Sequence, residues 1–345
     1  MVYVDALHFL ERSQNLPVID VRSPMEFRQG HIPLAINLPL FDDEERKKVG
    51  ILYKNSGREA SVLLGLEFAG PKMAGYVKDV RKVVQGKDIL MHCWRGGMRS
   101  NGLAWLLEIA GYNISVLEGG YKAYRRFIRQ QLGEACHILV LGGYTGSGKT
   151  EVLHILKEMG EQVIDLEAIA NHKGSAFGDI GQEKQPTNEQ FENYVFKAVQ
   201  KMDRTRPIWV EDESRSIGTV SIPDPFFIRM KESSLIFLEI DRIFRIPKLV
   251  EEYAGHDPGL LKNAIGKISE KLGGLNAKLA LEALDKKDFG KAVQLVLEYY
   301  DKAYLTGLQK RNRVKVIKMK TASLTRNDVS RIKVDAYKER QQQNP

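Results

Sequence analysis

The sequence contains very little cysteine: only Cys93 and Cys136 occur among its 345 residues. So few cysteines exclude a fold held together by disulfide bonds and indicate a reducing compartment, where a thiol stays reactive. The chain also lacks any run of about 18 apolar residues. Its first residues, MVYVDALHFLERSQ, carry charges where a signal peptide has an apolar core. We therefore expect a cytoplasmic protein that neither spans nor binds a membrane.

Acidic residues are scarce in the last part of the chain, from Gln309 to Pro345. The net charge of the whole protein is +8, and the excess of lysine and arginine in this segment accounts for all of it. Clustered positive charge is typical of nucleic-acid binding, although a solvated helical surface would have the same composition. The segment 310–345 is therefore predicted to be a basic C-terminal segment that contacts RNA.

The chain is longer than one ordinary domain, and its apolar segments follow an α/β order. LPVIDV, DILMHC and ISVLEGG are predicted to be buried parallel strands, and MRSNGLAWLLEIAG a helix between the last two. A second α/β unit, made of a strand, a glycine loop and a helix, begins near residue 137. We predict an N-terminal parallel-sheet domain over 1–130 and a P-loop kinase-like α/β domain with a helical extension over 137–309, followed by the basic segment.

A complete Walker A pattern lies between a predicted strand and a predicted helix. Glycines allow backbone N–H groups to converge on phosphate oxygens, a lysine adds a point charge, and a threonine hydroxyl is placed for Mg²⁺. The predicted phosphate-binding residues are Gly143, Gly146, Ser147, Gly148, Lys149 and Thr150.

Acidic and basic side chains farther along the chain are candidates for the same site. Asp212 follows the apolar run of PIWVEDES and is predicted to orient a metal ion or its water, with Glu211 as the alternative. Arg242 and Arg245 lie one helical turn apart and are predicted to contact phosphate. Surface salt bridges are the competing interpretation of these two arginines.

The stretch HCWRGGMRS, His92–Ser100, places a cysteine at the mouth of a loop rich in glycine and arginine. Backbone amides, the dipole of the following helix, Arg95 and Arg99 would stabilise a thiolate at Cys93, so we expect a charged, half-solvated sulfur. The spacing C-x5-R also fits the signature of cysteine phosphatases. The loop by itself favours phosphatase chemistry and sulfur or selenium transfer equally.

The flanks of this loop resemble the rhodanese family. VIDVRSPMEFRQGHIPLAINLPL places Asp20, Arg22, Glu26 and His31 in family positions, and VLEGGYKAYRRF resembles its closing segment. Rhodanese-like folds carry both sulfurtransferases and phosphatases, so this resemblance does not choose between the two activities.

The combination of a rhodanese-like domain with a P-loop domain resembles the tRNA 2-selenouridine synthase family. ILYKNSGREASVLLGLEFAG, ANHKGSAFG, QPTNEQFEN and VEDESRSIG match that family, and the resemblance covers almost the whole chain. It implies S-geranylation of a wobble 2-thiouridine of tRNA from geranyl diphosphate, followed by selenation from selenophosphate. Cys93 would then be the key thiol, with Arg95 and Arg99 holding selenophosphate, and the P-loop would hold the prenyl diphosphate or a nucleotide such as ATP.

Two further assignments follow from the resemblance. The segment SVLLGLEFAG, Ser61–Gly70, is a candidate lining for the prenyl chain, or an ordinary helix. tRNA is expected to contact basic residues of a connector helix and of the C-terminal segment, whose phosphate contacts make affinity fall with salt: Arg125, Arg126, Arg129, Lys310, Arg311 and Arg313. The competing classes are a phosphatase with a nucleotide-binding domain, a P-loop kinase with an inert rhodanese-like domain, and a non-catalytic RNA-binding module.

Overall fold

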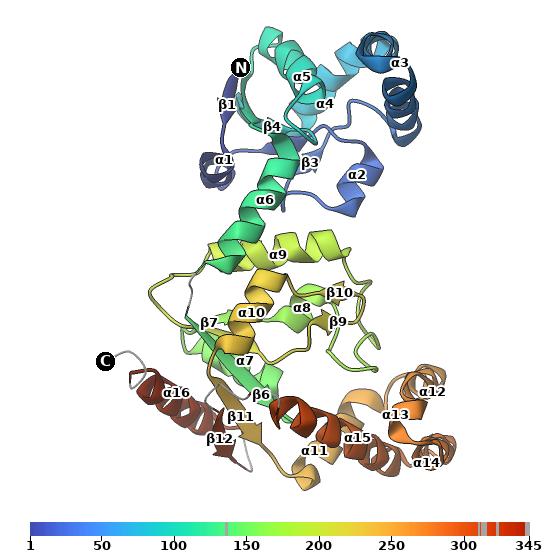
Figure 1. The fold of residues 1–345 in the computed structure, drawn as a ribbon, viewed down its shortest axis with the longest axis vertical. Helices are drawn as coiled ribbons and strands as arrows, with labels where there is room; N and C mark the ends of the chain where they lie inside the picture. The colour runs from blue at the N-terminus through green and yellow to red at the C-terminus, as the bar shows by residue number, and fades with distance from the viewer. Residues whose placement is uncertain (135–136, 310, 312–315, 322–323, 342–345) are drawn as a thin grey trace. The chain divides into compact units, whose positions relative to one another are not determined.

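The fold is described from a computed structural model, which describes residues 1–134, 137–309, 311, 316–321 and 324–341. The chain divides into two compact units, Met1–Gln131 and Leu132–Pro345 (Figure 1). Each unit contains a parallel five-stranded sheet, which confirms the predicted α/β class. No helix in the described part of the chain is long and apolar enough to cross a membrane.

The first unit has a sheet in the order β1-β5-β4-β2-β3. Every neighbouring pair is parallel, so the C-terminal ends of the strands meet at one edge of the sheet. The buried core combines strand residues such as Ile19 and Met91 with Leu103 and Leu107 of the helix after β4. The elements are β1 (Val2–Val4), α1 (Ala6–Arg12), β2 (Val18–Asp20), α2 (Pro24–Gln29), β3 (Ile36–Asn37), α3 (Asp43–Ala69), α4 (Met73–Val83), β4 (Asp88–His92), α5 (Met98–Ile109), β5 (Asn113–Leu117) and α6 (Gly120–Gly133).

The second unit has a parallel sheet in the order β12-β11-β6-β8-β7 and a helical region that follows β11. Its elements up to β11 are β6 (Ile138–Gly143), α7 (Lys149–Glu158), β7 (Gln162–Ile164), α8 (Leu166–Ala170), α9 (Asn188–Gln200), β8 (Ile208–Glu211), β9 (Ser216–Ile217), β10 (Val220–Ser221), α10 (Asp224–Glu232) and β11 (Leu235–Glu239). The remaining elements are α11 (Arg242–Tyr253), α12 (Pro258–Lys267), α13 (Ser269–Leu272), α14 (Gly274–Asp285), α15 (Phe289–Gln309), β12 (Val316–Lys320) and α16 (Arg326–Gln341).

The C-terminal segment differs from the separate basic segment that the sequence predicts. Strand β12 pairs in parallel with β11, with Leu235 opposite Val316. Helix α16 buries Val329, Ile332 and Ala336 in the core of the second unit, together with Leu153 and Trp209. Strand β12 and helix α16 therefore belong to the same sheet and core as the preceding part of the second unit. The apolar residues of this C-terminal segment are too widely spaced among lysines and arginines for the composition to reveal that it joins the sheet and the core.

Candidate active sites: two anion-binding loops

Cys93 directly follows β4, and its loop leads into α5. The closing segment after β5 holds this loop, because the Tyr121 N–H donates to the Cys93 carbonyl at 2.9 Å and the Lys122 N–H to the Trp94 carbonyl at 3.0 Å. The two backbones approach closely at Gly96 and Gly120, which both have positive φ. A Cβ on Gly120 would lie 2.5 Å from the Cys93 carbonyl oxygen, so only glycine fits there.

The sulfur of Cys93 faces its own loop but is more buried than expected. The residue is 3% exposed, which corrects the expectation of a half-solvated thiol. Its Sγ accepts hydrogen bonds from the Gly97 N–H at 3.4 Å and from the Ser100 hydroxyl at 3.3 Å. Burial by itself raises the pKa of Cys93, but the Ser100 hydroxyl, the charge of Arg99 and backbone N–H groups outweigh it. The net pKa is lowered, which favours the thiolate.

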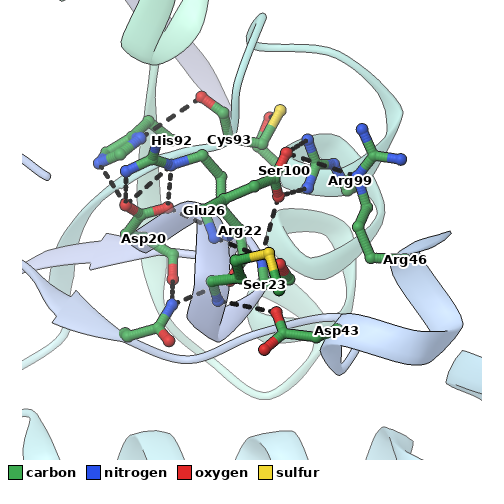
Figure 2. A network of polar contacts seen from close by, with 12 residues as sticks. Asp20, Arg22, Ser23, Glu26, Asp43, Arg46, His92, Cys93, Arg99 and Ser100 are labelled. Carbon is green, nitrogen blue, oxygen red and sulfur yellow. Dashed lines mark hydrogen bonds and ion pairs between the residues drawn. The ribbon is translucent and has the colours of Figure 1, made fainter. Parts of the chain in front are cut away.

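The two loop arginines have different surroundings. Arg99 donates to both carboxylate oxygens of Glu26, at 2.5 and 3.2 Å (Figure 2). Arg95 is exposed. Glu26 also caps α2 through Ser23, so this carboxylate fixes the Arg99 guanidinium beside the loop. Burial raises the pKa of Glu26, yet Arg99 and Arg46 lower it overall, so the pair is ionised.

A cluster of buried polar side chains, Asp20, Arg22 and His92, lies next to the loop. Arg22 donates to Asp20 at 2.6 Å (Figure 2). Its guanidinium lies 3.8 Å from the centre of the Tyr121 ring. Burial lowers the pKa of His92 to about 4 despite the nearby Asp20 carboxylate, so this imidazole is neutral at pH 7. Trp94 is half-buried, 5.8 Å from Tyr121 between ring centres, which is a packing position.

The predicted P-loop joins β6 to α7 and lines an open cleft. Its cavity volume is about 1410 Å³, and its walls include all of the predicted loop residues from Gly143 to Thr150 apart from Tyr144. Gly146 and Gly148 have φ near +76°, a backbone conformation that favours glycine. The Lys149 Nζ donates to the Gly143 carbonyl at 3.4 Å, which keeps the ammonium group curled over the loop.

Asp212 lines this cleft but already has three partners. It accepts from Lys231 at 2.9 Å, from Arg311 at 2.5 Å and from the Tyr304 hydroxyl at 2.8 Å. Two cations therefore neutralise the carboxylate that the sequence predicts to orient a metal ion. The described residues contain no cluster of three or more histidine, cysteine or acidic side chains placed to hold a metal. This arrangement does not fit a resident Mg²⁺ at Asp212.

Two glutamates, Glu167 and Glu213, line the same cleft as Lys149. Burial, the neighbouring Glu167 carboxylate and their shared hydrogen bond raise the pKa of Glu213 to about 8, although Lys149 opposes this. Burial likewise raises the pKa of Glu167. These raised pKa values favour keeping a proton on the Glu167–Glu213 pair next to the P-loop. Glu211, the alternative to Asp212, is buried and accepts from the Glu167 N–H at 2.7 Å.

Arg242 and Arg245 lie behind the P-loop. Arg245 is 2% exposed, pairs with both oxygens of Asp301 at 2.9 Å, and donates to the Thr145 carbonyl at 3.0 Å. Arg242 binds the same carboxylate at 2.8 Å. Arg245 is therefore held in a buried ion pair that supports the loop, in place of the predicted contact with phosphate, whereas Arg242 reaches the same Asp301 with a side chain that is 41% exposed.

The predicted tRNA-binding residues divide between α6 in the first unit and the C-terminal region of the second unit. Arg126 and Arg129 are exposed on α6, and Arg125 is half-buried there. Arg311 is bound to Asp212 in the P-loop cleft. Lys310 and Arg313 lie outside the described residues.

Replacing Ser100 with alanine tests the electrostatics of the cysteine loop. Loss of a hydrogen bond to the thiolate should raise the pKa of Cys93 and make alkylation by iodoacetamide at pH 7 roughly tenfold slower. The measurement is the pH dependence of that alkylation rate. Ser61→Ala is the matched control, since Ser61 is a buried helical serine whose hydroxyl donates to the Arg58 carbonyl. Coincident profiles for the Ser100 variant and the wild type would contradict this role.

Comparison with known proteins covers both units. The profile of a tRNA 2-selenouridine synthase AAA domain matches residues 136–331, and that of a rhodanese-like domain matches residues 5–127. The chain is 36% identical to a tRNA 2-selenouridine synthase of Bdellovibrio bacteriovorus, over 87% of this chain and 90% of the relative. It is 35% identical to proteins of the same name from Hydrogenovibrio crunogenus and Shewanella frigidimarina, over 86% of this chain and 91% and 90% of those relatives.

Proposed function

Because this chain belongs to the tRNA 2-selenouridine synthase family, we propose that it replaces sulfur by selenium at C2 of a wobble 2-thiouridine in tRNA. The observation that carries the proposal is the presence of two anion-binding loops in one chain: a thiol loop at Cys93 and a P-loop at Lys149. The two proposed donors, selenophosphate and geranyl diphosphate, are both phosphorylated anions. Each loop is assigned to one donor.

The P-loop is assigned to geranyl diphosphate. The thiocarbonyl sulfur attacks C1 of the geranyl group, the C–S bond forms, and the C–O bond to diphosphate breaks. Lys149 and the loop amides stabilise the departing charge. Alkylation removes the proton from N3 of the base, and the ionised member of the Glu167–Glu213 pair, which lines the same cleft, is the proposed acceptor.

Cys93 is assigned to selenophosphate, and the oxidation state of selenium favours attack of the thiolate on phosphorus. Selenium in selenophosphate is already fully reduced, so a perselenide on Cys93 would need an oxidant. Attack by the thiolate on phosphorus forms an S–P bond and breaks the P–Se bond, and selenide leaves with that electron pair. Selenide then attacks C2, the geranyl thiolate leaves, and water hydrolyses the phosphocysteine. The phosphatase-like spacing C-x5-R and the Ser100 hydroxyl beside Sγ support this assignment.

The experiment that tests the proposed function is mass spectrometry of nucleosides from tRNA that carries 2-thiouridine. We expect 2-selenouridine when the protein, geranyl diphosphate and selenophosphate are all present, and S-geranyl-2-thiouridine when selenophosphate is left out. A selenated product formed equally well without geranyl diphosphate would contradict the two-step route.

tRNA binding is proposed to use the exposed arginines of α6. Reversing one charge with Arg126→Glu should weaken tRNA binding and reduce the slope of log K against log salt by about 0.9 for each phosphate that the protein no longer neutralises. The measurement is tRNA affinity across a salt series. Lys278→Glu, an equal charge change at an exposed position of α14, is the control. Equal slopes for wild type and the Arg126 variant would contradict the use of this part of α6 in tRNA binding.

A further inference from the structure

The helical region of the second unit contains an apolar pocket to which the proposed reaction assigns no role. It lies among α11, α12, α14 and α15 and has a cavity volume of about 60 Å³. Its deep wall consists of the buried side chains Leu261, Ile265, Ala292 and Val296. Buried apolar voids stay dry and take up hydrocarbon, so this one is suited to an apolar ligand.

The pocket adjoins the phosphate cradle, because the two cavities share lining residues. Thr145 of the P-loop, Leu249 of α11 and Tyr300 of α15 line both the apolar pocket and the P-loop cleft. Leu249 packs against the loop, since a Cβ on Gly146 would lie 2.9 Å from it. A ligand whose anionic end lies on the P-loop would reach the pocket at these shared residues, past the Leu249 side chain.

The chemistry of the walls selects a hydrocarbon over a nucleotide base. A buried base needs partners for its polar edges, and an unsatisfied polar group is costly to bury. The two tyrosine hydroxyls of the pocket are engaged: Tyr300 accepts from the Ala176 N–H at 3.0 Å, and Tyr253 is hydrogen-bonded to Ser175.

The volume sets the length of the hydrocarbon. A void of about 60 Å³ holds roughly four to five water molecules on this measure, about the volume of one five-carbon unit. We infer that this pocket binds the terminal five-carbon unit of a prenyl chain whose diphosphate lies on the P-loop. This inference rests on the proposed function and adds a length limit: a two-unit chain fits, with its first unit left in the open cleft where tRNA sulfur must reach C1.

This site replaces the segment Ser61–Gly70, which the sequence suggested as a lining for the chain. In the structure Leu63 and Leu66 are exposed on α3, at 58% and 62%. A chain placed there would remain largely in water, whereas the pocket removes one end of it from solvent.

The test is equilibrium binding to the full-length protein without tRNA, with inorganic pyrophosphate and with dimethylallyl, geranyl and farnesyl diphosphates as ligands. We expect geranyl diphosphate to bind roughly tenfold to a hundredfold more tightly than pyrophosphate, the gain from burying one unit of this size. Ala292→Leu should fill the pocket, remove most of that gain and leave pyrophosphate affinity unchanged. Phe289→Ala should widen the pocket and increase the affinity for farnesyl diphosphate relative to that for geranyl diphosphate.

Two control variants make the test specific. Ala283→Leu makes the same change at a buried alanine of the same helical core outside the pocket walls, and should keep the geranyl preference. Leu66→Gln should also keep it. Loss of the preference in Leu66→Gln, or its survival in a folded Ala292→Leu protein that still binds pyrophosphate, would overturn the inference. If the predicted binding pattern holds but wild type makes no geranylated tRNA, the pocket stands and the proposed reaction fails.

Discussion

Changing Cys93 to serine is expected to lower 2-selenouridine formation at least roughly a thousandfold while S-geranylated tRNA accumulates. Serine keeps the shape of the loop but has a hydroxyl that stays protonated at neutral pH, so the nucleophile is lost. The Gly97 N–H and the Ser100 hydroxyl stabilise a thiolate at this position, and neither can ionise an alcohol. The measurement is the yield of both modified nucleosides by mass spectrometry over time.

The Cys93 loop also predicts a specific covalent intermediate. Acid quenching of the complete reaction should leave phosphorus on the Cys93 peptide, with more of it in the Ser100→Ala enzyme, because the hydroxyl that stabilises the departing thiolate is missing. Selenium on that peptide would contradict attack on phosphorus. Selenation of tRNA by Ser100→Ala with neither phosphorus nor selenium on the Cys93 peptide at any time would contradict it as well. Full selenation by Cys93→Ser would remove the thiol from the mechanism altogether.

Changing Lys149 to alanine is expected to lower geranylation of tRNA by roughly a hundredfold to a thousandfold. The ammonium group lies over the loop that would hold the diphosphate, and removing one such preorganised charge costs about this much transition-state stabilisation. Alkylation of Cys93 by iodoacetamide should keep its wild-type rate, because its thiolate is stabilised within its own loop. Geranyl transfer to 2-thiouridine tRNA is measured directly.

Lys248→Ala is the matched control for this prediction. Lys248 lines the same cleft but is paired with Glu151, so its removal should change geranylation far less. Geranylation that survives in Lys149→Ala while selenation of geranylated tRNA is lost would reverse the assignment of the two loops.

The features that sequence alone predicted depend on residues close together in the chain. The Cys93 loop with its backbone amides, and Lys149 with its glycines, each form within one strand–loop–helix unit, and the spacing of neighbouring residues is enough to identify them. The contact of the Ser100 hydroxyl with Sγ was not among the predictions. The parallel sheets follow from buried strands that alternate with helices.

What the sequence did not predict depends on partners far apart in the chain. Asp212 gains Arg311 and Tyr304 only when the C-terminal region folds onto the sheet. Glu167 in α8 and Glu213 after β8 come together only in the folded unit, so the raised pKa of this pair has no local pattern in the sequence. Arg245 pairs with Asp301 across two helices, and neither helix alone distinguishes a buried clamp from a phosphate ligand.

The most direct test of the division between the two loops is to supply tRNA that has been S-geranylated beforehand. Such tRNA bypasses the step assigned to the P-loop and needs only selenophosphate and the thiol. We predict that Lys149→Ala converts it to 2-selenouridine tRNA at close to the wild-type rate, while Cys93→Ser leaves it geranylated. Failure of Lys149→Ala to selenate this substrate, with its fold and Cys93 reactivity intact, would contradict the assignment of one donor to each loop.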